Sequence, residues 1–162
     1  MKAVLISIRP EWCAKIASGE KTIEVRKTRP KLETPFKCYI YCTLPRYPHE
    51  DFIEADYPKP QFYGGGKVIG EFVCDQIIED HTFGHDEKFY SAACMSACDA
   101  AAYAMQSPMY GWNISNLKIY DVPRELASLT GLRATRFGAA PYDIKRAPQS
   151  WCYVEETDND KT

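Results

Sequence analysis

Short strand-like runs dominate this sequence, and they constrain its fold more than any other feature. Six runs rich in β-branched and aromatic residues are typical of strands. They cover residues 2–8, 22–26, 38–43, 67–78, 114–122 and 150–154. Helical character is limited to two segments, and no strand–helix–strand alternation repeats. The sequence therefore predicts a mixed, mainly antiparallel α+β domain of five or six strands, with closure into a β-barrel as one option.

The helix candidates begin at Pro10 and cover residues 91–104. Proline suits the first position of a helix because its missing N–H would lack a partner there. Gly19 stands where a left-handed C-terminal cap is expected. Segment 91–104 is rich in alanine and contains no Gly or Pro, which favours a helix. We therefore expect two or three helices, the first of which leads directly into Glu20 and Lys21.

The length of 162 residues fits one domain, which we place at residues 1–156, with 157–162 as a frayed acidic tail. Residues 44–66 form a long stretch dense in Pro, Tyr and acidic residues. A loop of that length indicates a functional lid or an insertion. No apolar run approaches the ~20 residues needed to span a bilayer. The N-terminal run stops at Arg9 and does not resemble a secretory signal.

Seven cysteines occur, an odd number, and none of their spacings is C-x-x-C. Without a secretory signal, this pattern favours reduced thiols in a cytoplasmic protein, packed as small apolar side chains. His81 and His85 are four residues apart, but Gly84 between them weakens a helix, so we interpret the segment as a solvated loop. We therefore expect no metal site and no cofactor.

The net charge of −2 argues against a polycation that coats nucleic acid. The basic residues are nevertheless concentrated in segments 21–31 and 133–146, each of which contains a single acidic residue. If the two segments share a face, that face suits a ligand that carries phosphate. The alternative is two solvated loops that never meet.

The first basic segment contains the strongest candidate for site chemistry. Strand alternation places Thr22, Glu24 and Arg26 on one face. The guanidinium fork of Arg26 suits a phosphate or a base edge. Glu24 could accept protons from an exocyclic amine or act as a base, and Lys21 could bind phosphate or act as a nucleophile. The alternative is an amphipathic surface strand with an ordinary ion pair.

A second candidate is Glu71, which interrupts an apolar row formed with Ile69 and Val73 on one strand face. A carboxylate in such a row must be paired, protonated or functional. The alternative to a functional role is an inward-facing glutamate that an arginine satisfies.

Residues 19–26 match the pattern G-x-K-x-x-E-x-R and follow a strand and a short helix. This run resembles the motif of the ASCH family. Segments 119–126 and 146–156 resemble the C-terminal parts of ASCH proteins carried by phages and prophages, and strand 67–75 adds to the likeness. The resemblance implies a β-barrel similar to the PUA fold, with a cleft between barrel and helices, and a role in RNA binding or RNA metabolism.

Some ASCH proteins look like amidohydrolases that remove the acetyl group of acetylcytidine, and others are similar to ribonucleases. In the amidohydrolases a motif Lys, a Thr three residues later and a Glu on a later strand carry the chemistry. Lys21 matches the Lys and Glu71 the strand Glu. Glu24 stands at the Thr position, and this exchange changes both charge and hydrogen-bond donors.

The leading hypothesis is a domain that binds RNA, a modified nucleoside or a nucleotide in a cleft with a Lys/Glu/Arg lining. The expected contact residues are Arg9, Trp12, Lys21, Thr22, Glu24, Arg26, Lys27 and Arg29. One alternative is a metal-independent hydrolase in which Lys21, Glu24 and Glu71 carry the reaction. A second alternative is a phage accessory protein that binds a host protein.

Overall fold

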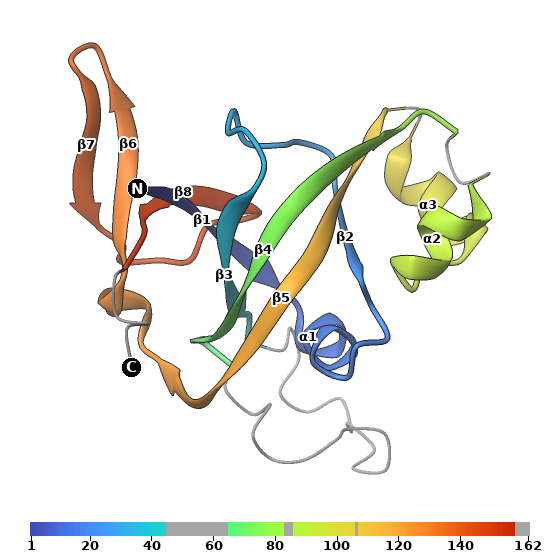
Figure 1. Ribbon diagram of the computed structural model, residues 1–162, viewed down its shortest axis with the longest axis horizontal. Coiled ribbons are helices and arrows are strands. Elements are labelled where there is room, and N and C mark those ends of the chain that lie inside the picture. The colour runs from blue at the N-terminus through green and yellow to red at the C-terminus, as the bar shows by residue number, and fades with distance from the viewer. Residues whose placement is uncertain (45–64, 83–85, 106, 158–162) are drawn as a thin grey trace. The chain divides into compact units, whose positions relative to one another are not determined.

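The computed structural model describes residues 1–44, 65–82, 86–105 and 107–157, and within them the chain forms eight strands and three α-helices (Figure 1). In chain order these are β1 Lys2–Ile8, α1 Pro10–Ala17, β2 Ile23–Arg26, β3 Phe36–Cys42, β4 Lys67–Asp80, α2 Glu87–Ala92, α3 Ala97–Ala104, β5 Met109–Arg124, β6 Thr130–Thr135, β7 Gly138–Asp143 and β8 Trp151–Glu155. Most of the loop expected at residues 44–66 lies outside the described residues. No helix in the described ranges is long and apolar enough to cross a membrane.

The eight strands are hydrogen-bonded in the order β2-β5-β4-β3-β1-β8-β6-β7. Strands β1 and β3 are parallel, whereas β1 with β8, β2 with β5 and β6 with β7 are antiparallel. The expected mixed, mainly antiparallel α+β fold is therefore confirmed. The expected closed barrel of five or six strands is wrong. The sheet has eight strands, and in the described part of the chain its order ends at β2 and β7 without closing.

The two unpredicted strands form the hairpin β6–β7. Its residues pair from Thr130 with Asp143 to Thr135 with Gly138. Most of the outer half of the hairpin is exposed on both faces, so its sequence lacks the apolar alternation by which a half-buried strand is recognised. Pro141 lies in the end strand β7, where its missing N–H costs no ladder hydrogen bond on the open side.

The single helix expected over residues 91–104 is also wrong, because the structure has two helices there. Helix α2 begins at Glu87, where the Asp86 side chain accepts a hydrogen bond from the N–H of Phe89. The chain then turns through Cys94, which has φ of 55°. Ser96 caps the start of α3 by accepting from the N–H of Asp99. Two N-terminal caps within one polar, alanine-rich stretch produce two short helices instead of one long one.

Most other strand predictions are confirmed within a few residues. Strand β5 extends further than the predicted 114–122 segment and passes Pro123 before it ends at Arg124. Gly19 has φ of 80°, as expected for the cap that ends α1. Beyond β8, Thr157 donates its backbone N–H to the Tyr39 hydroxyl at 3.0 Å. The rest of the tail expected to fray, residues 158–162, lies outside the described residues.

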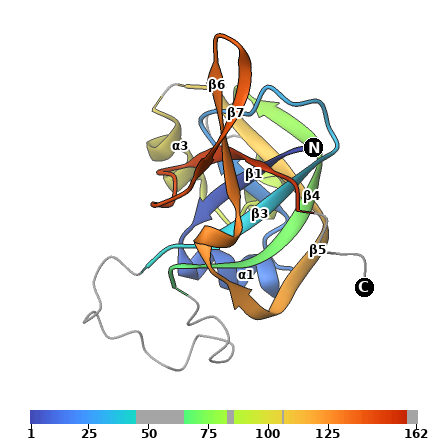
Figure 2. The same cartoon turned by 90° about the vertical axis from the view of Figure 1, so that its left-hand side faces the viewer.

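The chain divides into two compact units. Unit 1 comprises Met1–Ala14, Lys37–Phe72 and Lys118–Thr162, and unit 2 comprises Lys15–Phe36 and Val73–Leu117. The core of unit 1 forms around side chains such as Leu5, Tyr39 and Val154, all fully buried. These side chains come from β3, β1 and β8, which are neighbours in the sheet (Figure 2).

Unit 2 has its own core, in which helices α2 and α3 pack against each other (Figure 1). Its members include Ile23 and Val25 of β2, Phe89 of α2 and Ala100 of α3. Tyr90 of α2 is also buried there and donates its hydroxyl to Asp80 of β4 at 2.6 Å. Strand β2 is therefore fixed by apolar side chains on one face, and its other face carries the polar residues described next.

Candidate functional site

The end of helix α1 positions the start of strand β2. After the Gly19 turn, the backbone N–H of Lys21 donates to the carbonyl of Lys15 at 2.9 Å. Thr22 then donates to the carbonyl of Ala92 and accepts from Ile114, both at 2.9 Å. These backbone hydrogen bonds fix the main chain at Lys21 and Thr22, so the side chain of Lys21 has a defined direction.

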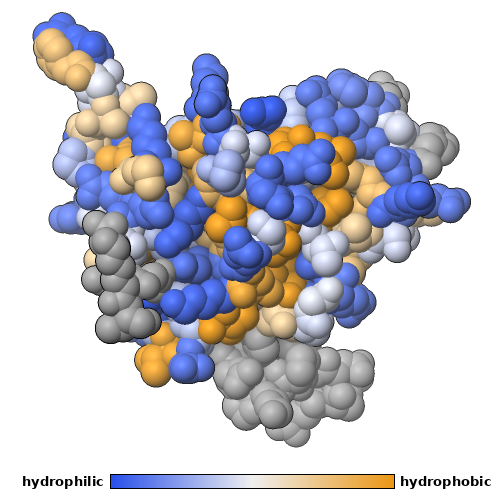
Figure 3. Space-filling model, viewed as in Figure 1, coloured by the Kyte–Doolittle hydropathy of each residue, from blue (hydrophilic) through white to orange (hydrophobic). Residues whose placement is uncertain are grey.

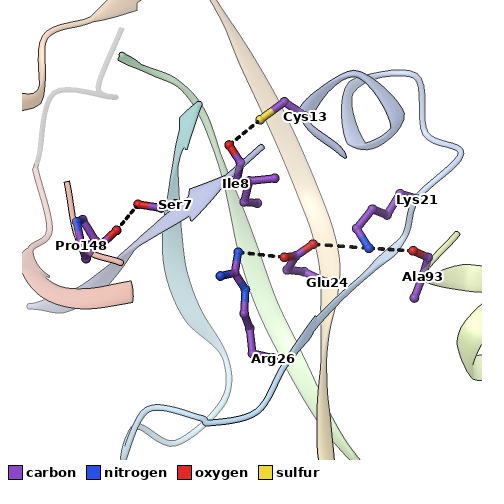
Figure 4. Close-up of polar contacts among 8 residues, drawn as sticks. All are labelled: Ser7, Ile8, Cys13, Lys21, Glu24, Arg26, Ala93 and Pro148. Atoms are coloured by element: carbon purple, nitrogen blue, oxygen red, sulfur yellow. Dashed lines mark hydrogen bonds and ion pairs between the residues drawn. The ribbon is translucent and has the colours of Figure 1, made fainter. Parts of the chain in front are cut away.

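Lys21, Glu24 and Arg26 form one connected ionic group, here called the β2 cluster. The ammonium of Lys21 lies 3.3 Å from one oxygen of Glu24, and the guanidinium of Arg26 lies 2.8 Å from the other. Lys21 also donates to the backbone carbonyl of Ala93 at 2.7 Å. Figure 4 shows the carboxylate of Glu24 between the two cationic groups.

The β2 cluster is buried, which rules out the surface ion pair that the sequence had left open. Lys21 is 4% exposed and Glu24 6%, and the Arg26 side chain is 12% exposed. Glu24 lies directly opposite Trp112 of β5 in the strand pairing, and Trp112 is fully buried. Opposed residues share a sheet face, so the indole shields the carboxylate and Trp112 belongs to the core.

The three side chains of the β2 cluster carry two positive charges and one negative charge. Charges taken out of water are costly unless other charges or hydrogen bonds compensate them. Glu24 pairs with both cations, and the carbonyl of Ala93 supplies a neutral acceptor for Lys21. The planar fork of Arg26 is a group suited to phosphate and carboxylate.

The basic residues that follow the β2 cluster are solvent-exposed. Lys27 and Arg29 are exposed, as is Thr22 before them. The Lys27 ammonium lies 4.9 Å from the ring centroid of Tyr103 in α3, and this ring is 40% exposed. A cation beside an accessible aromatic ring is an arrangement that contacts both phosphates and bases in single-stranded nucleic acids.

The predicted site residues fall in both units. Six of them, from Lys21 to Arg29, belong to unit 2. The other three predicted residues belong to unit 1. Of these, Arg9 is exposed and Trp12 is partly buried at the start of α1. The third is Glu71 of β4, whose contacts are described separately.

Glu71 is 7% exposed and has two partners in unit 1. It accepts a hydrogen bond from the Tyr120 hydroxyl at 2.5 Å, and the Lys37 ammonium lies 3.4 Å from its other oxygen. Burial and the hydrogen bond to Glu71 both raise the pKa of Tyr120. The predicted need for pairing is thus met by a tyrosine and a lysine, not by the arginine that the sequence suggested.

The sequence did not indicate the partners Tyr120, Lys37 and the Ala93 carbonyl. Tyr120 lies within the predicted strand 114–122. Its spacing of two residues from Lys118 was the one signal that could have placed both side chains on the same face of that strand. Strand pairing brings Lys37 to Glu71, and the break between α2 and α3 brings the Ala93 carbonyl to Lys21. No local sequence pattern encodes either contact.

In the described part of the chain, no group of three or more His, Cys, Asp or Glu side chains is placed so that it could hold a metal ion. His81 pairs with Glu79 at 3.1 Å, and His85 lies outside the described residues. Cys74 is buried, and this burial raises the pKa of its thiol to about 12. A thiol of that kind is a packing group and a poor metal ligand at neutral pH.

No protein-family model and no curated protein sequence matches this chain. Solved structures do match it. The structure of ASCH from Zymomonas mobilis is 18% identical, covers 95% of this chain and 88% of its own, and has a TM-score of 0.56. A Tyr-to-Phe variant of the same protein is 17% identical, covers 96% and 92%, and has a TM-score of 0.60. A Ser-to-Ala variant covers 95% and 89% at 18% identity, with a TM-score of 0.56.

Proposed function

Since this chain has the ASCH fold, we propose that it binds RNA or a modified nucleoside or nucleotide through the β2 cluster and the exposed basic segment behind it. The proposed contact set lies in unit 2 and consists of Lys21, Thr22, Glu24, Arg26, Lys27 and Arg29. Arg9 and Trp12 of unit 1 are not part of it. The phage likeness of the C-terminal segments stays a prediction.

The observation that carries this proposal is the pair of exposed cations, Lys27 and Arg29, directly after the β2 cluster. From Lys21 to Arg29 the segment has four basic side chains against the single carboxylate of Glu24. The acidic residues of the chain lie mostly elsewhere, so the segment is a local positive region on an acidic protein. Phosphate is the group that such a region fits best.

Within this proposal the residues have different tasks. Lys27 and Arg29 contact backbone phosphates, because they are exposed. Arg26 contacts a phosphate or a base acceptor through its guanidinium fork. Glu24 is a positioning residue, since its two oxygens hold Arg26 and Lys21 in place. Tyr103 offers a stacking surface for a base.

The test is the salt dependence of binding to a short fluorescein-labelled oligouridylate, measured by fluorescence anisotropy. Each phosphate contact adds roughly 0.7 to the slope of log K against log salt for a single strand. The double variant Lys27→Gln/Arg29→Gln should therefore reduce the slope by about 1.4 and weaken binding. Lys88→Gln, an exposed lysine on α2, is the control and should change neither. A wild-type affinity that does not respond to salt would reject the proposal.

A hydrolase is the second candidate, and the burial of Lys21 favours it. A buried lysine can act as a base or a nucleophile once its ammonium has lost a proton and the neutral amine is formed. Lys21 donates to both Glu24 and Ala93, so attack on a substrate would require these contacts to rearrange. Release of acetate from acetylcytidine by the wild type, and its loss in Lys21→Met, would establish this reaction. No release from the wild type would remove it.

A further inference from the structure

The hairpin β6–β7 is a second positive, aromatic surface, and it lies in unit 1 outside the proposed contact set. Residues 130–146 contain four basic side chains against one acidic side chain. Arg133 and Arg136 are both exposed. In Figures 1 and 2 the tip of the hairpin extends away from β1, β3 and β8 of the same unit.

The tip presents an aromatic ring that is almost fully accessible. Phe137 is 84% exposed, and the guanidinium of Arg136 lies 4.5 Å from its ring centroid. Figure 3 shows apolar and hydrophilic side chains together at this tip. An exposed phenylalanine contributes nothing to the core, and beside the Arg136 guanidinium its ring is open to a ligand.

The turn that carries Phe137 is held by hydrogen bonds of its own. The Thr135 hydroxyl accepts from the N–H of Phe137 at 3.2 Å and donates to the carbonyl of Gly138 at 2.8 Å. The ring is thus presented on an ordered turn. A preformed contact loses less conformational entropy on binding than a mobile one.

A second aromatic ring lies further down the hairpin. Tyr142 is paired with Gly131, and a Cβ on Gly131 would come within 2.3 Å of the Tyr142 ring. Only glycine therefore allows the ring to lie across β6. Arg133 follows Gly131 by two residues, on the same face of β6. Tyr142 is partly buried and packs against the core of unit 1, and this burial is the main cause that raises the pKa of its phenol.

We infer that the β6–β7 hairpin is a second contact surface for single-stranded RNA, in which Phe137 stacks on a base while Arg133 and Arg136 bind phosphates. The exposed ring of Phe137 lies beside Arg136, and Arg133 adds a second exposed cation on the same hairpin. An open ring together with exposed cations matches a polymer in which bases and phosphates alternate. An acidic peptide would match the charge but would leave the exposed phenylalanine without a partner. The inference rests on the proposed function for the identity of the ligand, but its residues are different.

The test uses the full chain and the same fluorescein-labelled oligouridylate. Phe137→Ala should weaken binding about 5-fold or more, since stacking on one base is worth roughly 1–3 kcal/mol, and Phe137→Trp should restore it. Arg133→Gln/Arg136→Gln should reduce the salt slope by about 1.4. Val122→Ala, which alters another exposed apolar side chain (77% exposed), is the control for Phe137 and should bind like the wild type. All of these side chains are exposed, so the urea midpoints should stay unchanged.

The two proposals fail in different ways. If the hairpin variants bind like the wild type while Lys27→Gln/Arg29→Gln binds weakly, the hairpin inference is wrong and the proposed function stands. If the hairpin variants alone weaken binding, the hairpin inference is supported and the β2 cluster is not the site. If the hairpin variants lose affinity for an oligoglutamate peptide but not for oligouridylate, the hairpin docks an acidic protein and the RNA inference is overturned.

Discussion

Two buried carboxylates, Glu24 in unit 2 and Glu71 in unit 1, stand in opposite electrostatic settings. Glu24 is one anion held between two cations, Lys21 and Arg26. In unit 1 the arrangement is reversed, because the Lys37 ammonium lies between Glu71 at 3.4 Å and Glu156 at 3.7 Å. The first carboxylate is shared by two cations, whereas the second shares one cation with another carboxylate. Burial of a glutamate therefore does not by itself indicate an anion site, because the charges paired with it differ between the two units.

The largest effect on stability is expected from Glu24→Ala. Removing the shared carboxylate takes away the anion that pairs with both buried cations, which costs about 3–5 kcal/mol in the free energy of unfolding. Urea denaturation measures this cost. Glu20→Ala is the matched control, because its partner Lys15 and Glu20 itself are 40% and 59% exposed, and such pairs contribute roughly 1 kcal/mol or less. Equal losses of unfolding free energy in Glu24→Ala and Glu20→Ala would show that solvent screens the β2 cluster as strongly as an exposed ion pair.

Glu71→Gln should have a smaller effect, about 1–3 kcal/mol. The substitution keeps the shape of the side chain but weakens the acceptor for the Tyr120 hydroxyl and removes the charge opposite Lys37. A double-mutant cycle with Tyr120→Phe should give a coupling energy, since the two groups are in direct contact. Glu156→Gln, whose side chain is 23% exposed, should change the stability less. Additive losses for Glu71 and Tyr120 would contradict the hydrogen bond.

Sequence patterns predicted the parts of the fold that bury apolar side chains in a regular pattern. Strands β1 and β8 and the helix that ends before Gly19 are of this kind, and their boundaries were close to the observed ones. The β6–β7 hairpin was missed because both faces of its outer half are exposed, so no period-2 pattern marks it. The break between α2 and α3 was missed because a serine within an alanine-rich segment does not by itself interrupt a helix. Ser96 caps a new helix only where tertiary contacts favour the turn before it.

For the candidate site, the sequence identified side chains but not their partners. The spacing of Lys21, Glu24 and Arg26 was sufficient to predict an ionic group on or beside one strand. Its burial could not be predicted, because it depends on Trp112, which a distant strand brings opposite Glu24. Similarly, the sequence showed that Glu71 needed a partner, but tertiary pairing alone supplied Tyr120 and Lys37.

Acid should weaken unit 2 through Asp80, by roughly 1 kcal/mol for hydrogen bonds of this kind. Burial raises the pKa of Asp80, but hydrogen bonds from Tyr90 and Thr82 outweigh it and hold the pKa below its usual value. The stabilisation is therefore complete above about pH 3.9, the usual pKa of an aspartate, and is lost as the pH falls through the lower folded-state pKa. In urea titrations Asp80→Asn should flatten this acid dependence, whereas Asp121→Asn, an exposed aspartate, should leave it unchanged. Parallel acid curves for Asp80→Asn and the wild type would contradict the assignment.

The smallest change in stability and the sharpest comparison of the two units come from a pair of exposed lysines. Lys27 lies 4.9 Å from the Tyr103 ring centroid in unit 2, and Lys2 lies 5.6 Å from that of Tyr153 in unit 1. Because exposed cation–π contacts contribute about 0.5–1 kcal/mol at most, Lys27→Met and Lys2→Met should change the urea midpoint little and to a similar extent.

Their effects on RNA should nevertheless differ. Lys27→Met removes one proposed phosphate contact, so the salt slope for oligouridylate should fall by about 0.7. Lys2→Met removes the same charge and a similar ring contact, but outside the proposed contact set, and should leave the slope unchanged. Equal reductions would show that oligouridylate responds to net charge alone. In that case the basic segment after the β2 cluster would carry no binding specificity, and the contrast between Glu24 and Glu71 would concern stability only.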